Sequence, residues 1–220
     1  MFKLAIIILV IIVFIKLKDY KFDLKSFFKK GLPPIDDRYA VWVFHGRQGT
    51  GKNYVSVYEL LKQNSDIVTK VKTNIKSLKI PNYKIEYFDK VCEIYRDTEE
   101  YVIYVIDEVS RKYDKNSRTD MQFYAWLNQS RKRHRIVMLI TQEWKELPMW
   151  LRRPVKFTFS TQPFGPKFLH LFCTSIGDAE NMYLDKDTLE WECPVIKKFV
   201  YKRNLYIANM YDTFEAINDL

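Results

Sequence analysis

The feature that most constrains this chain is a glycine-rich segment between a predicted strand and a predicted helix. Residues Gly46 to Lys52 read Gly-Arg-Gln-Gly-Thr-Gly-Lys. The frame Gly-x-x-x-x-Gly-Lys binds phosphate because its glycines let successive backbone N–H groups point at one anion. Tyr39 to His45 before it is an apolar run of strand length, and apolar residues recur at helical spacing from Tyr54 to Leu61. This context favours a phosphate-binding loop over an incidental turn.

The loop predicts a nucleotide site that includes the start of the helix. The Lys52 side chain is expected to reach the terminal phosphates, and the helix N-terminus adds positive potential. Asn53 takes the place where Ser or Thr normally gives a hydroxyl to Mg²⁺, so slow turnover or binding without hydrolysis stays open. The predicted nucleotide-binding residues are Gly46, Arg47, Gln48, Gly49, Thr50, Gly51, Lys52, Asn53 and Tyr54.

Two adjacent acids follow a second apolar run. Tyr101 to Ile106 has the composition of a buried strand, and Asp107 and Glu108 stand at its C-terminal end. Downstream of a phosphate-binding loop, Asp107 is expected to hold Mg²⁺, and Glu108 to orient and deprotonate the water that attacks the γ-phosphate of ATP. The sequence therefore favours an ATP hydrolase over a nucleotide switch.

Three more residues are candidates for the same chemistry. Ile136 to Thr141 is a third apolar strand, and Gln142 after it is placed to sense the γ-phosphate or position water; alternatively, it simply begins a loop. Arg152 and Arg153 are candidates for an arginine finger that completes the site of a neighbouring subunit, although paired arginines are more often surface residues.

The order of the segments predicts an α/β fold with a mainly parallel sheet flanked by helices. Further strands are expected at Ile67 to Thr73 and Lys84 to Phe88, and a helix from about Thr119. Consecutive apolar positions in the central strands indicate that helices cover both faces of the sheet. After Val155 the chain turns to short aromatic-rich runs with turn signals, which predicts added β-hairpins.

The N-terminal segment predicts a membrane anchor. Leu4 to Ile15 is an unbroken apolar run, and residues 1–34 hold +5 of the net charge of +9. With most lysines after the run, the positive-inside rule predicts a single pass through the host inner or plasma membrane with the body cytoplasmic. A signal peptide and a buried core segment are the alternatives. The expected domains are residues 1–34 as anchor and basic segment, and residues 35–220 as ATPase domain.

A basic segment, Arg131 to Arg135, closes the predicted helix before Ile136. Its cations suit a helix C-terminus, which makes a purely structural role one interpretation. Contact with the backbone phosphates of single-stranded DNA, without reading of sequence, is the other. The residues alone do not separate the two.

Taken together, the motifs of Tyr39 to Val155 resemble the zonula occludens toxin (Zot) family, which includes filamentous-phage assembly ATPases and belongs with the HerA and FtsK motors. The resemblance rests on Gly46 to Lys52 followed by Tyr54, Lys72-Thr73-Asn74-Ile75, Ile106-Asp107-Glu108, Arg133-His134-Arg135, Ile136 to Gln142, and Leu151-Arg152-Arg153. It implies a membrane-associated ATPase with ATP and Mg²⁺ as cofactors. It also implies a homo-oligomeric ring that drives single-stranded DNA out of the cell during virion assembly, with other phage assembly or coat proteins as partners.

Four other functions remain open from the sequence. The same motor chemistry serves genome packaging into a capsid and conjugative DNA transfer. A non-catalytic nucleotide-binding membrane scaffold is the alternative from a different class, since Asn53 weakens the expected metal site. A small-molecule kinase would use the same phosphate loop, but it has no use for a membrane anchor.

Overall fold

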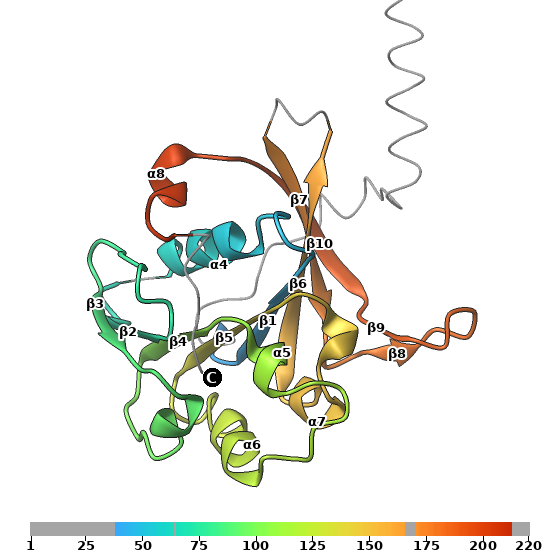
Figure 1. Cartoon of the computed structure of the whole chain (residues 1–220), viewed down its shortest axis with the longest axis horizontal. Coiled ribbons are helices and arrows are strands. Elements are labelled where there is room, and N and C mark those ends of the chain that lie inside the picture. The colour runs from blue at the N-terminus through green and yellow to red at the C-terminus, as the bar shows by residue number, and fades with distance from the viewer. Residues whose placement is uncertain (1–37, 64, 166–169, 213–220) are drawn as a thin grey trace, which may run out of the picture.

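The computed structural model describes residues 38–63, 65–165 and 170–212. They form an eight-stranded sheet with helices on both faces and a separate two-stranded sheet (Figure 1). The strands are β1 (Val41–His45), β2 (Lys70–Thr73), β3 (Lys84–Tyr87), β4 (Val102–Ile106), β5 (Ile136–Thr141), β6 (Val155–Phe164), β7 (Leu171–Asp178), β8 (Tyr183–Leu184), β9 (Trp191–Glu192) and β10 (Val195–Lys202). The helices are α4 (Lys52–Leu61), α5 (Val109–Lys112), α6 (Met121–Asn128), α7 (Met149–Arg152) and α8 (Leu205–Ala208), with 3-10 turns η1 (Val91–Ile94) and η2 (Trp144–Glu146).

The sheet is mainly parallel, as predicted. Its order is β10-β7-β6-β1-β5-β4-β2-β3, and the strands from β6 to β3 all run in the same direction. Because β5 lies between β1 and β4, the loop after β1 and the acids after β4 emerge at the same edge of the sheet. β7 and β10 add antiparallel strands beside β6, which confirms the predicted C-terminal hairpins.

Alternation along the strands divides the core into two layers. Trp42 and Phe44 of β1 face α4 and α8, whereas Val41 and Val43 face the side covered by α5, α6 and α7 (Figure 1). β5 is buried at every position, as expected for a central strand covered on both faces. The helix expected from about Thr119 begins at Met121, since the Asp120 side chain accepts the Phe123 N–H and caps it.

The predicted localisation in a membrane is wrong for the part of the chain that the structure describes. In residues 38–63, 65–165 and 170–212, no helix has both the length and the apolar composition needed to cross a bilayer. The apolar run from Leu4 to Ile15 and the expected domain boundary after residue 34 lie outside the described residues.

Candidate active site

The glycine-rich loop closes tightly against the end of the sheet. The Gly46 N–H donates to the Gln142 carbonyl (2.9 Å), so the loop starts beside the tip of β5. A Cβ at residue 46 would lie 2.4 Å from Thr50 Oγ1 and 2.5 Å from the Thr161 carbonyl oxygen, so only glycine fits there. Gly51 has φ of 89° against the Phe172 ring and leads directly into α4. The loop thus presents the N-terminus of a ten-residue helix, the positive end of its dipole.

A direct hydrogen bond joins this loop to the acid pair. Asn53 Nδ2, in the first turn of α4, donates to Asp107 Oδ2 at 2.9 Å. Asp107 is buried at the end of β4, and burial raises its pKa to about 6, against smaller opposing effects from the Glu108 N–H, the Lys52 ammonium and Asn53. The loop, Lys52 and Asp107 therefore converge at one point.

The Asn74 side chain fixes the backbone of Asp107 through two hydrogen bonds. The Asp107 N–H donates to Asn74 Oδ1 (2.9 Å), and Asn74 Nδ2 donates to the Asp107 carbonyl (3.2 Å). Asn74 follows β2, which pairs with β4, and it is 4% exposed. No role was predicted for Asn74. A polar residue directly after a strand of the predicted parallel sheet was the signal that could have found it.

Asn53 and Asp107 offer oxygen donors that fit a magnesium ion. Asn53 Oδ1 is buried without a hydrogen-bond partner, and the neighbouring Asp107 carboxylate is desolvated. Mg²⁺ prefers such hard oxygen ligands and keeps several waters, with nucleotide phosphates supplying the rest. The described residues hold no group of three or more His, Cys, Asp and Glu side chains arranged for a metal. The donor set therefore suits an ion that arrives with a nucleotide.

Glu108 occupies an unusual backbone conformation. Its φ of 54° and ψ of 37° lie in the left-handed region, where a non-glycine residue is strained. Its Oε2 accepts from Arg111 Nη1 at 2.7 Å, and its side chain is 35% exposed. Glu108 is thus placed at the acid end of β4, but its carboxylate is engaged by Arg111.

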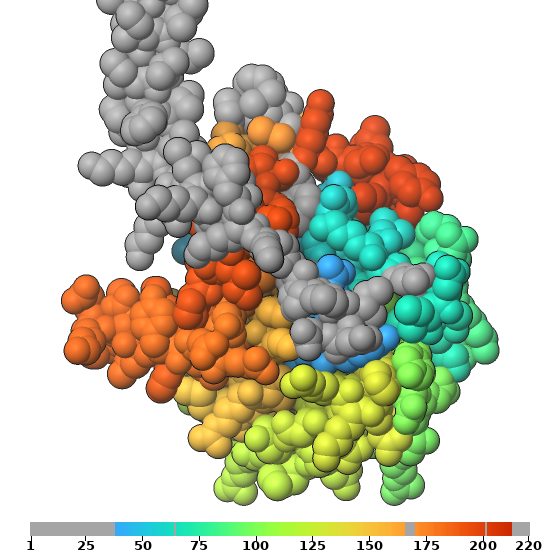
Figure 2. All heavy atoms as spheres, turned by 180° about the vertical axis from the view of Figure 1, so that it is seen from behind, coloured from blue at the N-terminus to red at the C-terminus, as the bar shows by residue number. Residues whose placement is uncertain are grey.

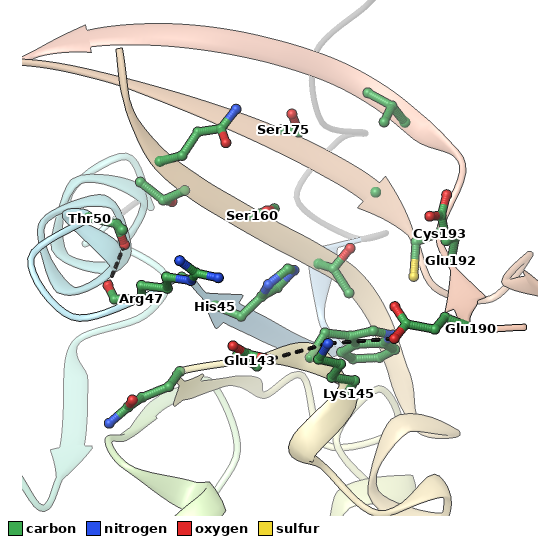
Figure 3. Close-up of a pocket in the computed structure, with 18 of the residues that line it drawn as sticks. His45, Arg47, Thr50, Glu143, Lys145, Ser160, Ser175, Glu190, Glu192 and Cys193 are labelled. Carbon is green, nitrogen blue, oxygen red and sulfur yellow. Dashed lines mark hydrogen bonds and ion pairs between the residues drawn. The ribbon is translucent and has the colours of Figure 1, made fainter. Parts of the chain in front are cut away.

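A cavity of about 750 Å³ adjoins the loop (Figure 3). Arg47 and Thr50 border it on the loop side, and Lys145, paired with Glu190 at 3.5 Å, borders it on the other. Exposed Gln142 also lines it, whereas the neighbouring Thr141 Oγ1 is buried without a partner. The cavity is large enough for a small organic ligand and touches the glycine-rich loop, but Lys52, Asn53, Asp107 and Glu108 are not part of its lining.

Comparisons with known proteins identify the fold. Neither a protein-family model nor the sequence of a curated protein matches the chain. Among solved structures, the N-terminal domain of zonular occludens toxin from Neisseria meningitidis has a TM-score of 0.57 and 17% identity, covering 80% of this chain and 100% of that domain. The chain has the fold of a Zot-like P-loop NTPase.

The genome-packaging NTPase of Sulfolobus turreted icosahedral virus 2 shares this fold at lower identity. Its complex with sulfate has a TM-score of 0.50 and 13% identity, covering 73% of this chain and 98% of that one. Its complex with AMPPCP has a TM-score of 0.50 and 12% identity, covering 70% and 95%. At these identities the likeness concerns the fold alone, so the chemistry of this chain has to follow from its own residues.

The two candidate finger arginines have different environments. Arg152 is buried; its Nε donates to the Leu147 carbonyl (2.8 Å) and its Nη2 to the Lys145 carbonyl (2.6 Å), with the guanidinium over the Trp144 ring. This geometry holds the connection between β5 and β6 together. Arg153, the next residue, is exposed.

The basic segment also divides into structural and exposed parts. Arg135 is fully buried and donates to the carbonyls of Glu99 (2.6 Å) and Asp97 (2.7 Å). Arg133 Nη1 donates to the Thr98 carbonyl at 2.9 Å. These contacts fasten the turn before β4, which is the structural interpretation. Arg131 and Lys132 are exposed, so any contact of this segment with DNA falls to them.

Proposed function

We propose that the chain is an ATPase that drives single-stranded DNA out of the cell during assembly of a filamentous phage. The observation that supports the proposal is the hydrogen bond from Asn53 Nδ2 to Asp107 Oδ2. The Lys52 ammonium is also close enough to lower the pKa of Asp107 by charge attraction. The hydrogen bond joins a phosphate-binding loop to an acidic strand end around one point, which is the arrangement that phosphoryl transfer requires.

Each residue then has a defined task. The backbone N–H groups of the loop and Lys52 bind the phosphates, and Asp107 and Asn53 Oδ1 hold magnesium, which neutralises charge that develops on the phosphates. Glu108 would orient the attacking water; its ion pair with Arg111 lies at the surface, where such pairs are weak and easily exchanged. Gln142 supports the water or the γ-phosphate from the tip of β5.

Arg153 supports a proposal of shared sites in a ring. β6 runs parallel to β1, with Val155 beside Val41, so Arg153 lies at the sheet edge opposite the glycine-rich loop. It cannot reach the nucleotide of its own subunit and would complete the site of a neighbour. Single-stranded DNA and coat or assembly proteins of the phage are the proposed partners, and exposed Arg131 and Lys132 are candidates for phosphate contacts.

The test is phosphate release by the purified chain with ATP and magnesium, with and without single-stranded DNA. Hydrolysis should be DNA-stimulated and should fall at least about a hundredfold in Lys52→Ala. The control Lys90→Ala removes an exposed lysine outside the site and should keep full activity. Activity that ignores DNA and survives Lys52→Ala would overturn the proposal.

A non-catalytic nucleotide-binding scaffold is the second candidate. It is favoured by the amide of Asn53 in place of a hydroxyl and by the Glu108–Arg111 pair. In that case ATP recovered from the protein after long incubation would be intact, and Glu108→Gln would bind nucleotide as the unaltered chain does. Recovery of ADP would exclude the scaffold.

A further inference from the structure

The β8–β9 hairpin forms a sheet of its own, which the ion pair of Glu190 with Lys145 joins to the body of the protein. It pairs only with itself in a two-stranded sheet and projects from the body in both views (Figures 1 and 2). Its large apolar side chains are between 39% and 74% exposed: Tyr183, Leu184, Leu189 and Trp191. Leu184 and Trp191 are paired across the hairpin and share one of its faces, whereas Tyr183 lies on the other face. A two-stranded hairpin is marginal alone in water, so the exposed face with Leu184 and Trp191 is a candidate contact surface.

The charge of the hairpin indicates the kind of partner. Residues 178–193 contain six acids and one lysine, a net charge of −5, whereas the whole chain carries +9. The remainder of the chain therefore carries +14. An acidic surface repels nucleic acid and attracts a basic protein. Another copy of this chain is such a protein.

A complementary surface lies at the other end of the sheet. A groove of about 640 Å³ opens between β3 and α8, and its lining is mostly apolar, including Ile80, Ile85, Tyr206 and Met210. Lys79 is the charged residue of that lining. Along the chain, the hairpin follows β7 and precedes β10, the two strands at one end of the eight-stranded sheet. β3 is the last strand at the opposite end (Figure 1).

We propose that the β8–β9 hairpin of one copy docks into the β3–α8 groove of the next. Apolar side chains would fill an apolar groove, and the acids of the hairpin would face Lys79. Because the two surfaces are different and lie at opposite ends, the contact is head-to-tail and closes into a ring or continues as a filament. The contact requires neither binding nor hydrolysis of a nucleotide, so it can be tested separately from the proposed ATPase activity.

The experiment measures the assembly size of the purified chain by sedimentation velocity. Leu189→Lys on the hairpin and Tyr206→Lys in the groove should each raise the dissociation constant at least about tenfold. Leu189 is 74% exposed and Tyr206 62%, so neither change disturbs the core. Met121→Lys is the matched control, since Met121 is 67% exposed and lies on neither surface; it should assemble normally.

Mixing the two variants tests the direction of the contact. A Leu189→Lys copy keeps its groove and a Tyr206→Lys copy keeps its hairpin, so the mixture should form heterodimers and nothing larger. Normal assembly of Leu189→Lys, a monomeric unaltered chain, or folded variants that stay monomeric when mixed would each overturn the proposal. Should a variant fail to fold, the charge exchange of Asp187→Lys against Lys79→Glu decides: each alone should weaken assembly, and the mixture should restore it, because both contacts between unlike copies pair opposite charges; no recovery in the mixture would overturn the proposal.

Discussion

Two aspartates at opposite edges of the sheet, the half-buried Asp97 and the buried Asp107, have opposite environments. Asp97, near the amino end of β4, accepts hydrogen bonds from Lys72 Nζ, the Tyr104 hydroxyl (2.7 Å) and the Glu99 N–H (2.8 Å). Burial alone would raise its pKa, but these partners hold it below the usual value. Asp107, at the carboxyl end of β4, has its pKa raised to about 6 by burial.

The difference separates a structural carboxylate from a functional one. Asp97 is neutralised by the protein itself, through a lysine and two hydrogen-bond donors. Asp107 has an amide donor and a more distant Lys52, and it lies beside the unpartnered Asn53 Oδ1. A rise of its pKa from 3.8 to about 6 corresponds to on the order of 3 kcal/mol. In the proposed site that cost would be recovered when a cation binds, which supports a magnesium nucleotide as its ligand.

The largest expected effect comes from exchanging the two residues for asparagine. Asp107→Asn should lower magnesium-dependent ATP turnover at least about a hundredfold, since a ligand of the ion is lost. Asp97→Asn should leave turnover per folded molecule nearly unchanged but lower the melting temperature, because Lys72 loses the charge of its least exposed partner and keeps only Glu86 and Glu99. Phosphate-release rates and thermal melts of both variants check this. Equal losses of turnover in the two variants would contradict the distinction between a structural Asp97 and a functional Asp107.

Arg152 and Arg153 extend the comparison to adjacent residues. Arg153→Ala should lower turnover about a hundredfold or more with little change in stability. Arg152→Ala should destabilise the fold by about 2–4 kcal/mol, because the Leu147 and Lys145 carbonyls lose their donor. Mixing Arg153→Ala with Lys52→Ala should restore part of the turnover if sites are shared. The absence of rescue would count against shared sites.

The two aspartates also predict opposite pH slopes. The pKa of Asp97 is lowered by folding, so its stabilisation is present above its unfolded pKa of about 4 and is lost as the pH falls through the folded value. The pKa of Asp107 is raised, so its cost is absent below pH of about 4 and complete above about 6. From pH 4 to 6, Asp107→Asn should gain stability relative to the unaltered chain, by denaturant titration; a flat difference would be inconsistent with a desolvated carboxylate.

The smallest effect concerns Asn53. Asn53→Thr introduces the hydroxyl that normally serves magnesium and should raise turnover by up to about tenfold. It also removes the hydrogen bond to Asp107, so the basal stability should fall slightly. Steady-state kinetics over a range of magnesium concentrations separates the two effects. A decrease in turnover at saturating magnesium would show that the amide has a role that a hydroxyl cannot replace.

Much of the fold was predictable because local patterns encode it. β1, β4 and β5 are apolar runs of strand length, and the glycines after β1 mark a loop where a Cβ does not fit. Their order along the chain predicted a parallel sheet with the loop and the acids at one edge. The sequence motifs resemble the Zot family, and the structural similarity to the Zot N-terminal domain confirms that resemblance at the level of the fold.

Other features depend on pairings that no local pattern records. Asn74 reaches Asp107 only because β2 lies beside β4, with Thr73 opposite Val105. Arg152 and Arg153 are neighbours in sequence, yet the turn of α7 buries one and exposes the other. Arg135 looked like part of a basic surface, but it closes the turn before β4. These outcomes are set by tertiary packing.

The most direct test of the central claim is the magnesium dependence of ATP affinity, measured by calorimetric titration of the purified chain. Affinity in magnesium should exceed affinity in chelator by about tenfold or more, and Asp107→Asn should remove this difference while Asp97→Asn keeps it. If magnesium increased ATP affinity by the same factor in the Asp107→Asn variant as in the unaltered chain, the assignment of Asp107 as a magnesium ligand would be contradicted.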